Sequence, residues 1–181
     1  QKDIAITGEG TIDGGGSNET WWKWCGKERF GWTPSLEESQ KIGRPLLFKY
    51  SEAGLDIEKR NMKDKGMRPQ LINLYECENI AIKNVTLFNS PFWVIHPLLS
   101  KNILVKGVKI WNEGPNGDGC DPESCHDVII EDCTFHTGDD CIAIKSGRNK
   151  DGLKWNIPSE NIIIRNCKME DGHGGVVLGS E

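Results

Sequence analysis

The sequence contains a repeat of four rows, which begin at Asn79, Asn102, Asp127 and Asn161. Four positions, at one, three, six and eight residues past each row start, are apolar in every row. The first two columns are Ile80, Ile103, Val128 and Ile162, then Ile82, Val105, Ile130 and Ile164. The last two are Val85, Val108, Cys133 and Cys167, then Leu87, Ile110, Phe135 and Met169. Columns that stay apolar through successive rows are typical of a stacked repeat.

The length and composition of the rows predict an all-β fold, a parallel β-helix. The row starts at 79, 102, 127 and 161 make the rows 23, 25 and 34 residues long. This length suits a coil of three short strands that stacks on the previous coil at roughly 4.8 Å. Leucine-rich repeats would need Leu at fixed positions and a recurring internal Asn. A sandwich of hairpins would not keep the same columns at coil-length separation.

The corners of the predicted coils carry residues that tolerate a left-handed backbone. Five positions past each row start stand Asn84, Gly107, Asp132 and Asn166. Gly, Asn and Asp adopt positive φ more readily than other residues, so we expect a bend between the two strands of each row. We also expect the Asn and Asp residues at the row starts to hydrogen-bond along the stack.

The chain divides into a first coil, an excursion and a run of consecutive coils within one partial domain. Residues 1–14 resemble another coil, one residue out of register, and residues 69–181 hold the consecutive coils. Residues 15–68 form an irregular excursion between them. Its charged part, from Lys49 to Arg68, is expected to be a solvated loop. Its aromatic part could stack on sugar rings or form a small satellite core. The aromatic residues are Trp21, Trp22, Trp24, Phe30 and Trp32.

Composition excludes several classes of partner. The net charge is −5 with acidic and basic residues interspersed, which argues against a nucleic-acid surface. No apolar stretch approaches the roughly 18 residues of a membrane span. The seven Cys residues form no pair of zinc knuckles. Cys133 and Cys167 share a core column, so we expect them to be buried thiols rather than a disulfide.

Three polar clusters converge on one edge of the predicted stack. Gly138-Asp139-Asp140 and Gly172-His173-Gly174 occupy the same place in successive rows, and Asn116-Gly117-Asp118 reaches it in the row before. Carboxyl groups and a His are what acid–base hydrolysis requires, since one acid protonates a leaving oxygen while a carboxylate activates water. Asp in Gly-rich turns can also cap strands, and clustered Asp can bind Ca²⁺. Four such groups in consecutive coils favour catalysis, and we expect no metal and no cofactor.

These motifs, in this order on a β-helix repeat, resemble the polygalacturonase family of pectin-degrading glycoside hydrolases (family 28), and bacterial members most. The resemblance implies a right-handed parallel β-helix and inverting hydrolysis of α-1,4-galacturonosyl bonds in polygalacturonate or a pectic oligosaccharide. It implies that Asp139 is the general acid, that Asp118 and Asp140 hold the attacking water, and that His173 supports the acid. The expected substrate-binding residues are Asn116, Lys145, Arg148, His96, Gly172 and Gly174. Lys145 and Arg148 would supply the local cations that a uronate needs despite the acidic net charge.

Two departures from the family pattern affect the expectation. Gly117 replaces a Thr that is usual in fungal members, and no Arg-x-Lys tripeptide follows His173. We therefore expect an incomplete β-helix, about half to two-thirds of a full domain, with low activity on its own. Its open coil edge would allow self-association. A secreted or periplasmic location is expected from the resemblance.

Other functions remain open at the level of sequence. A hydrolase of rhamnogalacturonan or another decorated pectin would use the same acid–base residues. A β-helix resembling pectate lyase would instead need Ca²⁺ and an Arg base. A non-catalytic β-helix that binds glycans is the third alternative.

Overall fold

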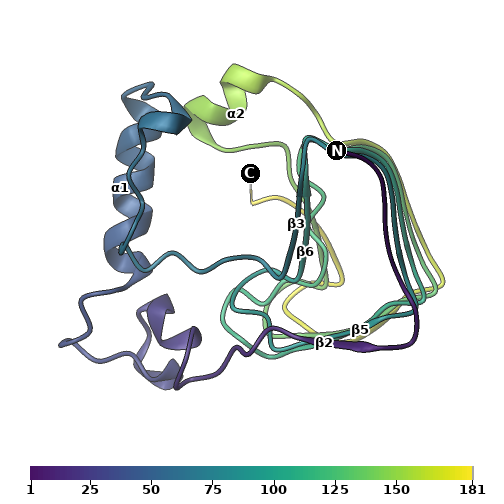
Figure 1. The fold of residues 1–181 in the computed structure, drawn as a ribbon, viewed down its shortest axis with the longest axis horizontal. Helices are drawn as coiled ribbons and strands as arrows, with labels where there is room; N and C mark the ends of the chain where they lie inside the picture. The colour runs from purple at the N-terminus through teal and green to yellow at the C-terminus, as the bar shows by residue number, and fades with distance from the viewer. Residues whose placement is uncertain (181) are drawn as a thin grey trace.

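The computed structural model describes residues 1–180, whose strands stack as the coils of a parallel β-helix (Figure 1). Each coil contributes strands to three sheets, and every strand pair is parallel. This confirms the predicted fold. Among the described residues, no helix is long and apolar enough to cross a membrane.

The first sheet contains one strand from each of five rows. Its order is β1 (Lys2–Thr7), β4 (Glu78–Lys83), β7 (Lys101–Lys106), β9 (His126–Glu131) and β12 (Glu160–Arg165). The second sheet follows the bend in each row. Its order is β2 (Thr11–Asp13), β5 (Thr86–Phe88), β8 (Lys109–Asn112), β10 (Thr134–Thr137) and β13 (Lys168–Asp171).

The third sheet is the one that carries the site. It pairs β3 (Ile72–Tyr75) with β6 (Ile95–Leu98), and β11 (Ile142–Ile144) with β14 (Val176–Leu178). Residues 120–123 join the two pairs through bridges to β6 on one side and to β11 and Lys145 on the other. The sheet therefore runs through all the consecutive coils.

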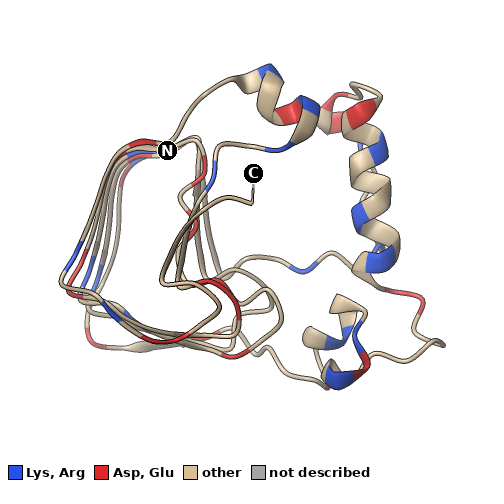
Figure 2. Cartoon of the chain, turned by 180° about the vertical axis from the view of Figure 1, so that it is seen from behind, with Lys and Arg blue, Asp and Glu red and all other residues tan. Residues whose placement is uncertain are grey.

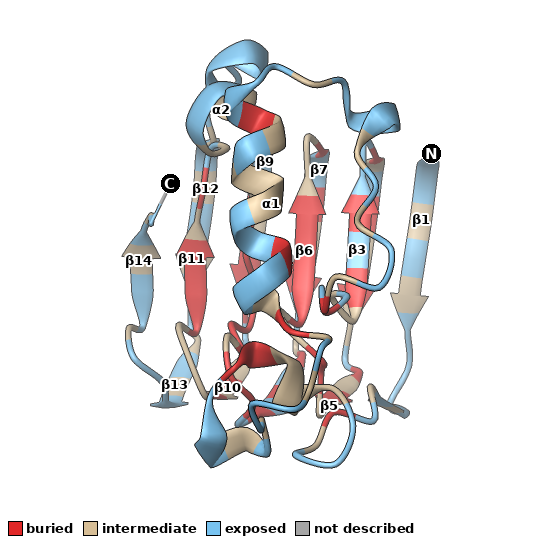
Figure 3. Ribbon diagram, turned by 90° about the vertical axis from the view of Figure 1, so that its left-hand side faces the viewer, coloured by how far each residue is buried: buried red, intermediate tan, exposed pale blue. Residues whose placement is uncertain are grey.

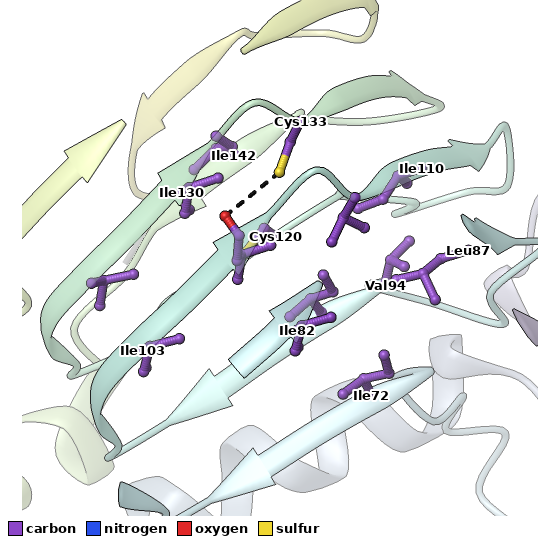
Figure 4. Close-up of a cluster of buried hydrophobic side chains, with 14 of the residues drawn as sticks. Ile72, Ile82, Leu87, Val94, Ile103, Ile110, Cys120, Ile130, Cys133 and Ile142 are labelled. Atoms are coloured by element: carbon purple, nitrogen blue, oxygen red, sulfur yellow. Dashed lines mark hydrogen bonds between the residues drawn. The ribbon is translucent and has the colours of Figure 1, made fainter. Parts of the chain in front are cut away.

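The apolar columns form the core in the register that the repeat predicts. Ile80 pairs with Ile103, Ile103 with Val128, and Val128 with Ile162. The interior side chains of the middle rows are almost fully buried (Figure 4). Ile4 also pairs with Ile80, and Ile12 with Leu87, so the first coil carries one extra residue at its bend. The continuous stack places every row at a fixed position relative to the next.

Left-handed residues shape two corners of each row, and the corner inside the row was predicted. Asn84, Gly107, Asp132 and Asn166 all have φ between 55° and 63°. The row starts are left-handed too, and their side chains form a ladder. Asn102 Nδ2 donates to Asn79 Oδ1 at 2.6 Å, and Asn79 Nδ2 donates to Asp3 Oδ1 at 2.7 Å. The ladder repeats between Asn161 and Asp127 at 3.2 Å.

The excursion is more regular than the sequence suggested. It contains α1 (Gln40–Glu52) and three 3₁₀ helices, and a later loop adds α2 (Asn149–Trp155). The 3₁₀ helices are η1 (Trp22–Cys25), η2 (Glu28–Phe30) and η3 (Ile57–Lys59). The Ser39 side chain caps α1 by accepting a hydrogen bond from Lys41 N. The segment expected to be a solvated loop, from Lys49 to Arg68, thus begins inside α1.

Several hydrogen bonds and ion pairs fasten the excursion to the rest of the chain. Arg60 forms a bidentate pair with Asp151 of α2 at 2.7 Å, and Trp22 Nε1 donates to Ser90 O at 3.0 Å. The ring of Trp22 also packs edge-on against Phe30. None of the five aromatic residues lines the groove described below. These contacts favour the satellite-core interpretation over sugar stacking.

All seven Cys residues are free thiols. Cys133 Sγ donates to Val105 O of the preceding row at 3.6 Å (Figure 4). Burial raises the pKa of this thiol to about 12, so it stays protonated. The expectation of a buried thiol is confirmed for Cys133, whereas Cys167 is a free thiol that is only half-buried against the core.

Candidate active site

A groove of about 530 Å³ lies between α1 and the third sheet. Figure 3 shows α1 running parallel to the strands, and therefore across the direction in which the coils stack. One face of α1 lines the groove with Gln40, Arg44, Leu47 and Phe48. The opposite side contains Asp118, Asp139, Asp140 and Lys145. The site is thus shared between the repeat and the excursion.

The turns before the third sheet place the acidic residues. Asp118 precedes the segment that starts at Cys120, and Asp139 and Asp140 precede β11. The turns are tied row to row, since Gly119 N donates to Asp140 O at 3.0 Å and His173 N donates to Asp139 O at 2.9 Å. The sequence places these residues at one edge because each turn occupies the same position in its coil.

Glycine is required in these turns by close backbone contacts. A Cβ on Gly117 would lie 2.5 Å from Gly114 O, so the Thr of fungal members would not fit this turn without a backbone shift. A Cβ on Gly174 would lie 2.4 Å from Val177 Cγ2 and 3.1 Å from Asp140 Oδ1. Gly174 therefore gives Asp140 room to face the groove, rather than contributing a side chain of its own.

The three carboxyl groups come together as predicted. Asp118, Asp139 and Asp140 each offer one oxygen, and these oxygens all lie within 4.8 Å of one another. Asp118 is buried, whereas the other two are half-buried. Three acids this close cannot all ionise cheaply, so at least one keeps a proton to higher pH. The arrangement can support acid–base chemistry, and the same oxygens could hold a divalent cation.

Burial and mutual repulsion perturb two of the three acids. Loss of solvent, followed by the charge of Asp139, raises the pKa of Asp118 to about 7, while Lys145 opposes the shift. The same two causes raise the pKa of Asp140, again against Lys145. Two neighbouring acids with raised pKa values in a groove are typical of catalytic sites.

His173 contacts only one of the acids. Its Nδ1 lies 3.1 Å from Asp139 Oδ1, and its side chain is 68% exposed at the edge of the groove. The structure thus brings His173 to the residue predicted to be the acid. It places the imidazole beside the groove rather than among the groove-lining residues.

Lys145 lies deeper than a substrate-binding residue would be expected to lie. Its side chain is 6% exposed, and Nζ donates to Gly179 O at 3.0 Å. The same Nζ lies 4.0 Å from Asp118 Oδ2 and 4.9 Å from the centre of the Trp93 ring. Lys145 therefore acts on Asp118 directly, and its charge stays close to the acids.

A cationic wall, formed by Arg44, Arg148 and the ring of Phe48, faces the acidic side. The guanidinium carbons of Arg44 and Arg148 lie 5.3 Å and 4.4 Å from the Phe48 ring centre. Figure 2 shows basic residues along α1 and the loop before α2, and acidic residues in the turns of the coils. The groove thus offers cations on one side and acids on the other. Arg148, which was predicted to bind substrate, lines this groove.

His96 does not have the predicted role. It is buried in β6, where Asn73 Nδ2 donates to Nδ1 at 2.9 Å and Nε2 donates to Glu123 Oε2 at 2.8 Å. Both ring nitrogens are used internally, so the side chain offers nothing to a sugar. The aromatic neighbourhood in the sequence reflects packing, since the Trp93 ring lies edge-on against His96 at 4.9 Å.

Arg68 is a groove residue that the sequence analysis missed. Its buried guanidinium donates to Pro115 O at 2.6 Å and to Asn116 Oδ1 at 2.7 Å, and also to Gln40 Oε1 at 2.8 Å. It therefore connects the turn before Asp118 to the start of α1. Burial lowers its pKa to about 10. Arg68 was missed because it lies outside the repeat, at the end of a charged segment that is typical of solvated loops. Asn116 is thus held by Arg68.

The comparisons with known proteins identify the family of this chain. The family model described as glycosyl hydrolases family 28 matches residues 52–181. The chain belongs to this family. The family 28 match begins at the last residue of α1, so most of that helix precedes it.

The chain spans about a third or less of the length of the curated relatives that it matches. It is 36% identical to "Probable polygalacturonase" of Vitis vinifera and 32% identical to "Exo-poly-alpha-D-galacturonosidase" of Dickeya chrysanthemi. Each match covers 99% of this chain and 30% of the relative. A solved exopolygalacturonase from Thermotoga maritima superimposes with a TM-score of 0.95 at 43% identity, covering 99% of this chain and 41% of that one. This chain thus covers 30% to 41% of these whole proteins, whereas about half to two-thirds of a full β-helix domain was expected from the sequence.

Proposed function

We propose that the protein hydrolyses α-1,4-galacturonosyl linkages in polygalacturonate by acid–base catalysis. The observation that carries the proposal is the meeting of three carboxyl oxygens within 4.8 Å in the groove of a family 28 chain. Asp139 protonates the leaving oxygen, supported by His173. Asp118 and Asp140 hold and deprotonate the attacking water. The cationic wall attracts the carboxylates of the substrate. Because this substrate is a cell-wall polymer, we further propose a secreted or periplasmic location.

The test is release of reducing ends from polygalacturonate by the whole protein. Hydrolysis predicts new reducing ends, no product absorbing in the ultraviolet, and no loss of rate in EDTA. Unsaturated products that require Ca²⁺ would replace the proposal by a lyase. Faster cleavage of rhamnogalacturonan than of polygalacturonate would replace the substrate but keep the acid–base residues.

Inversion is part of the proposal because the family resemblance implies it. Inverting enzymes usually separate their two carboxyl groups by roughly 6.5–9.5 Å, and retaining enzymes by about 5–5.5 Å. These ranges describe whole carboxyl groups, whereas the 4.8 Å limit here joins single oxygens of the three acids, so it does not select one range. NMR of the first-formed anomer decides between them, since a retained α-product contradicts inversion.

We also propose that the enzyme attacks chain ends. The two matched proteins from Dickeya chrysanthemi and Thermotoga maritima are described as exo-acting enzymes. Supporting this, α1 crosses the stacking direction in front of the third sheet (Figure 3). A polymer laid along the coils would meet this helix, whereas a chain end would stop against it. Exo attack predicts short products from the first minutes and a slow fall in viscosity, and an early ladder of long oligomers would contradict it.

A further inference from the structure

Asp121 is a buried acid without a visible hydrogen-bond donor. Its side chain is 0% exposed, and neither carboxyl oxygen meets a donor among the described residues. It lies in the third sheet between His96 of the row before and Ala143 of the row after, because Cys120 pairs with Ile95 and Ile142. An ionised carboxylate in such a place would lose its hydration without any replacement.

Asp121 lies close enough to Asp118 and Lys145 for both to act on its carboxyl group, and its segment pairs with β11 and Lys145. The Lys145 ammonium is 4.0 Å from Asp118, and the Trp93 ring covers both Lys145 and His96 at 4.9 Å. His96 is hydrogen-bonded to Glu123, and the charge of Asp140 in the next row also raises the pKa of Asp121. The buried cluster therefore holds two carboxyl groups and one ammonium group.

One buried ammonium group balances only one buried carboxylate. Asp118 is the better candidate for the charge, because it borders the groove and lies near Lys145. Burial, followed by the charge of Asp118, raises the pKa of Asp121 well above its ordinary value. The pKa of Asp118 rises only to about 7. The more deeply buried acid is thus the one that keeps its proton.

We propose that Asp121 is a positioning residue, which remains protonated at neutral pH and donates its proton to the Asp118 carboxylate in a hydrogen bond. The hydrogen bond gives the Asp121 carboxyl group a partner, since neither of its oxygens meets another one among the described residues. It fixes the orientation of Asp118 and favours its charged form. The link to catalysis rests on the proposed role of Asp118 as a base. The protonated state of Asp121 does not rest on it.

Infrared spectroscopy tests the protonated state without any activity. At about pH 9, Asp118 is ionised and Asp121 should still show the carbonyl band of a protonated carboxylic acid. We expect Asp121→Asn to lose this band. Asp132→Asn, at an exposed left-handed corner where the equivalent residues are Asn84 and Asn166, should keep it. If Asp121→Asn does not fold, the unmutated chain decides, because its band should vanish in urea. No band at pH 9, or an unchanged band in Asp121→Asn, overturns the proposal.

The pH profile tests the effect on Asp118. Asp121→Leu keeps the approximate size but removes the donor, so deprotonation of Asp118 becomes harder. The acidic limb of kcat/KM should move upward by about one to two pH units. Asp121→Asn retains a donor and should move the limb less. A packing role alone would lower kcat in both variants without moving the limb, and that result overturns the proposal. An inactive protein would contradict the proposed function, while the infrared result would still decide on Asp121.

Discussion

Asp139 differs from the other two groove acids because only it has a histidine partner, at 3.1 Å. The His173 side chain is 68% exposed and that of Asp139 is 26% exposed, so this carboxyl group is open to the groove. Asp118, in contrast, is buried beside Lys145. The environments of the two acids therefore differ, since one carboxyl group lies beside an imidazole and the other beside a buried ammonium group.

We predict that Asp139→Asn lowers kcat of the whole enzyme by roughly 10²–10⁴-fold while KM changes little. The amide keeps the shape of the side chain but cannot protonate a leaving group. Steady-state kinetics on oligogalacturonates measure both constants. Asp64→Asn, an exposed substitution in the excursion, is the control. A change confined to KM would assign Asp139 to substrate binding instead.

The raised pKa of Asp118 predicts a pH-dependent stability. Its pKa moves from 3.8 to about 7 on folding, so the folded chain binds this proton more tightly than the unfolded chain. The contribution is full below about pH 4 and is lost as the pH rises towards 7. At about 1.4 kcal/mol per pKa unit, it amounts to at most about 4 kcal/mol.

Urea unfolding between pH 4 and pH 8 measures this contribution. The free energy of unfolding of the unmutated chain should fall over this range by more than that of Asp118→Asn. Parallel pH curves for the two proteins would contradict the assignment of the shift to Asp118.

At the level of elements, the repeat and the excursion differ in how far sequence predicts them. Strands β4, β7, β9 and β12 follow from apolar columns that recur four times, and the turns carrying the acids occupy fixed places in those rows. Helix α1 occurs once, and it packs across the groove through long-range contacts. The burial of Arg68 could not be predicted either. It depends on long-range hydrogen bonds to carbonyl groups, and the sequence does not distinguish such an Arg from one on the surface. For His96 the sequence predicted a substrate contact that the structure does not show. Its polar partners, Asn73 and Glu123, come from neighbouring rows, and the sequence does not reveal this pairing.

Helix α1 yields a prediction about substrate binding. Arg44→Gln removes one guanidinium from the Phe48 ring. KM for oligogalacturonates should rise by about 3- to 30-fold, with a smaller effect on kcat. The reason is that a charged hydrogen bond contributes roughly 1–2 kcal/mol at a partly exposed site. Arg29→Gln is a matched control, since Arg29 lies 4.8 Å from the Phe30 ring in the excursion and does not line the groove. Equal effects of the two variants on KM would exclude a specific role of the cationic wall.

At the scale of the whole molecule, the two ends of the described stack expose interior columns. Ile162, Ile164 and Met169 are half-buried, whereas Val128, Ile130 and Phe135 of the preceding row are 0% exposed. Strand β12 also has no further neighbour among the described residues. An unpaired strand edge next to an apolar surface favours the addition of another strand.

We therefore predict that these 181 residues, prepared alone, self-associate as their concentration rises. Sedimentation velocity at several concentrations measures the association. Ile164→Lys should weaken it, because this side chain faces the interior column. Ile163→Lys, on the opposite face of the same strand and 50% exposed, should have little effect. A single monomeric species at every concentration would contradict the prediction.

The ladder of left-handed Asn and Asp residues has a consequence for how such a molecule can change over evolution. Each rung requires only a small polar residue in its own coil and a matching one in the adjacent coil, so a duplicated or deleted coil leaves the remaining rungs satisfied. The three groove acids, Asp118, Asp139 and Asp140, lie outside the ladder, in turns whose length differs from coil to coil. Length and chemistry can therefore vary separately: the number of coils can grow by copying, while a turn acquires new side chains without disturbing the scaffold.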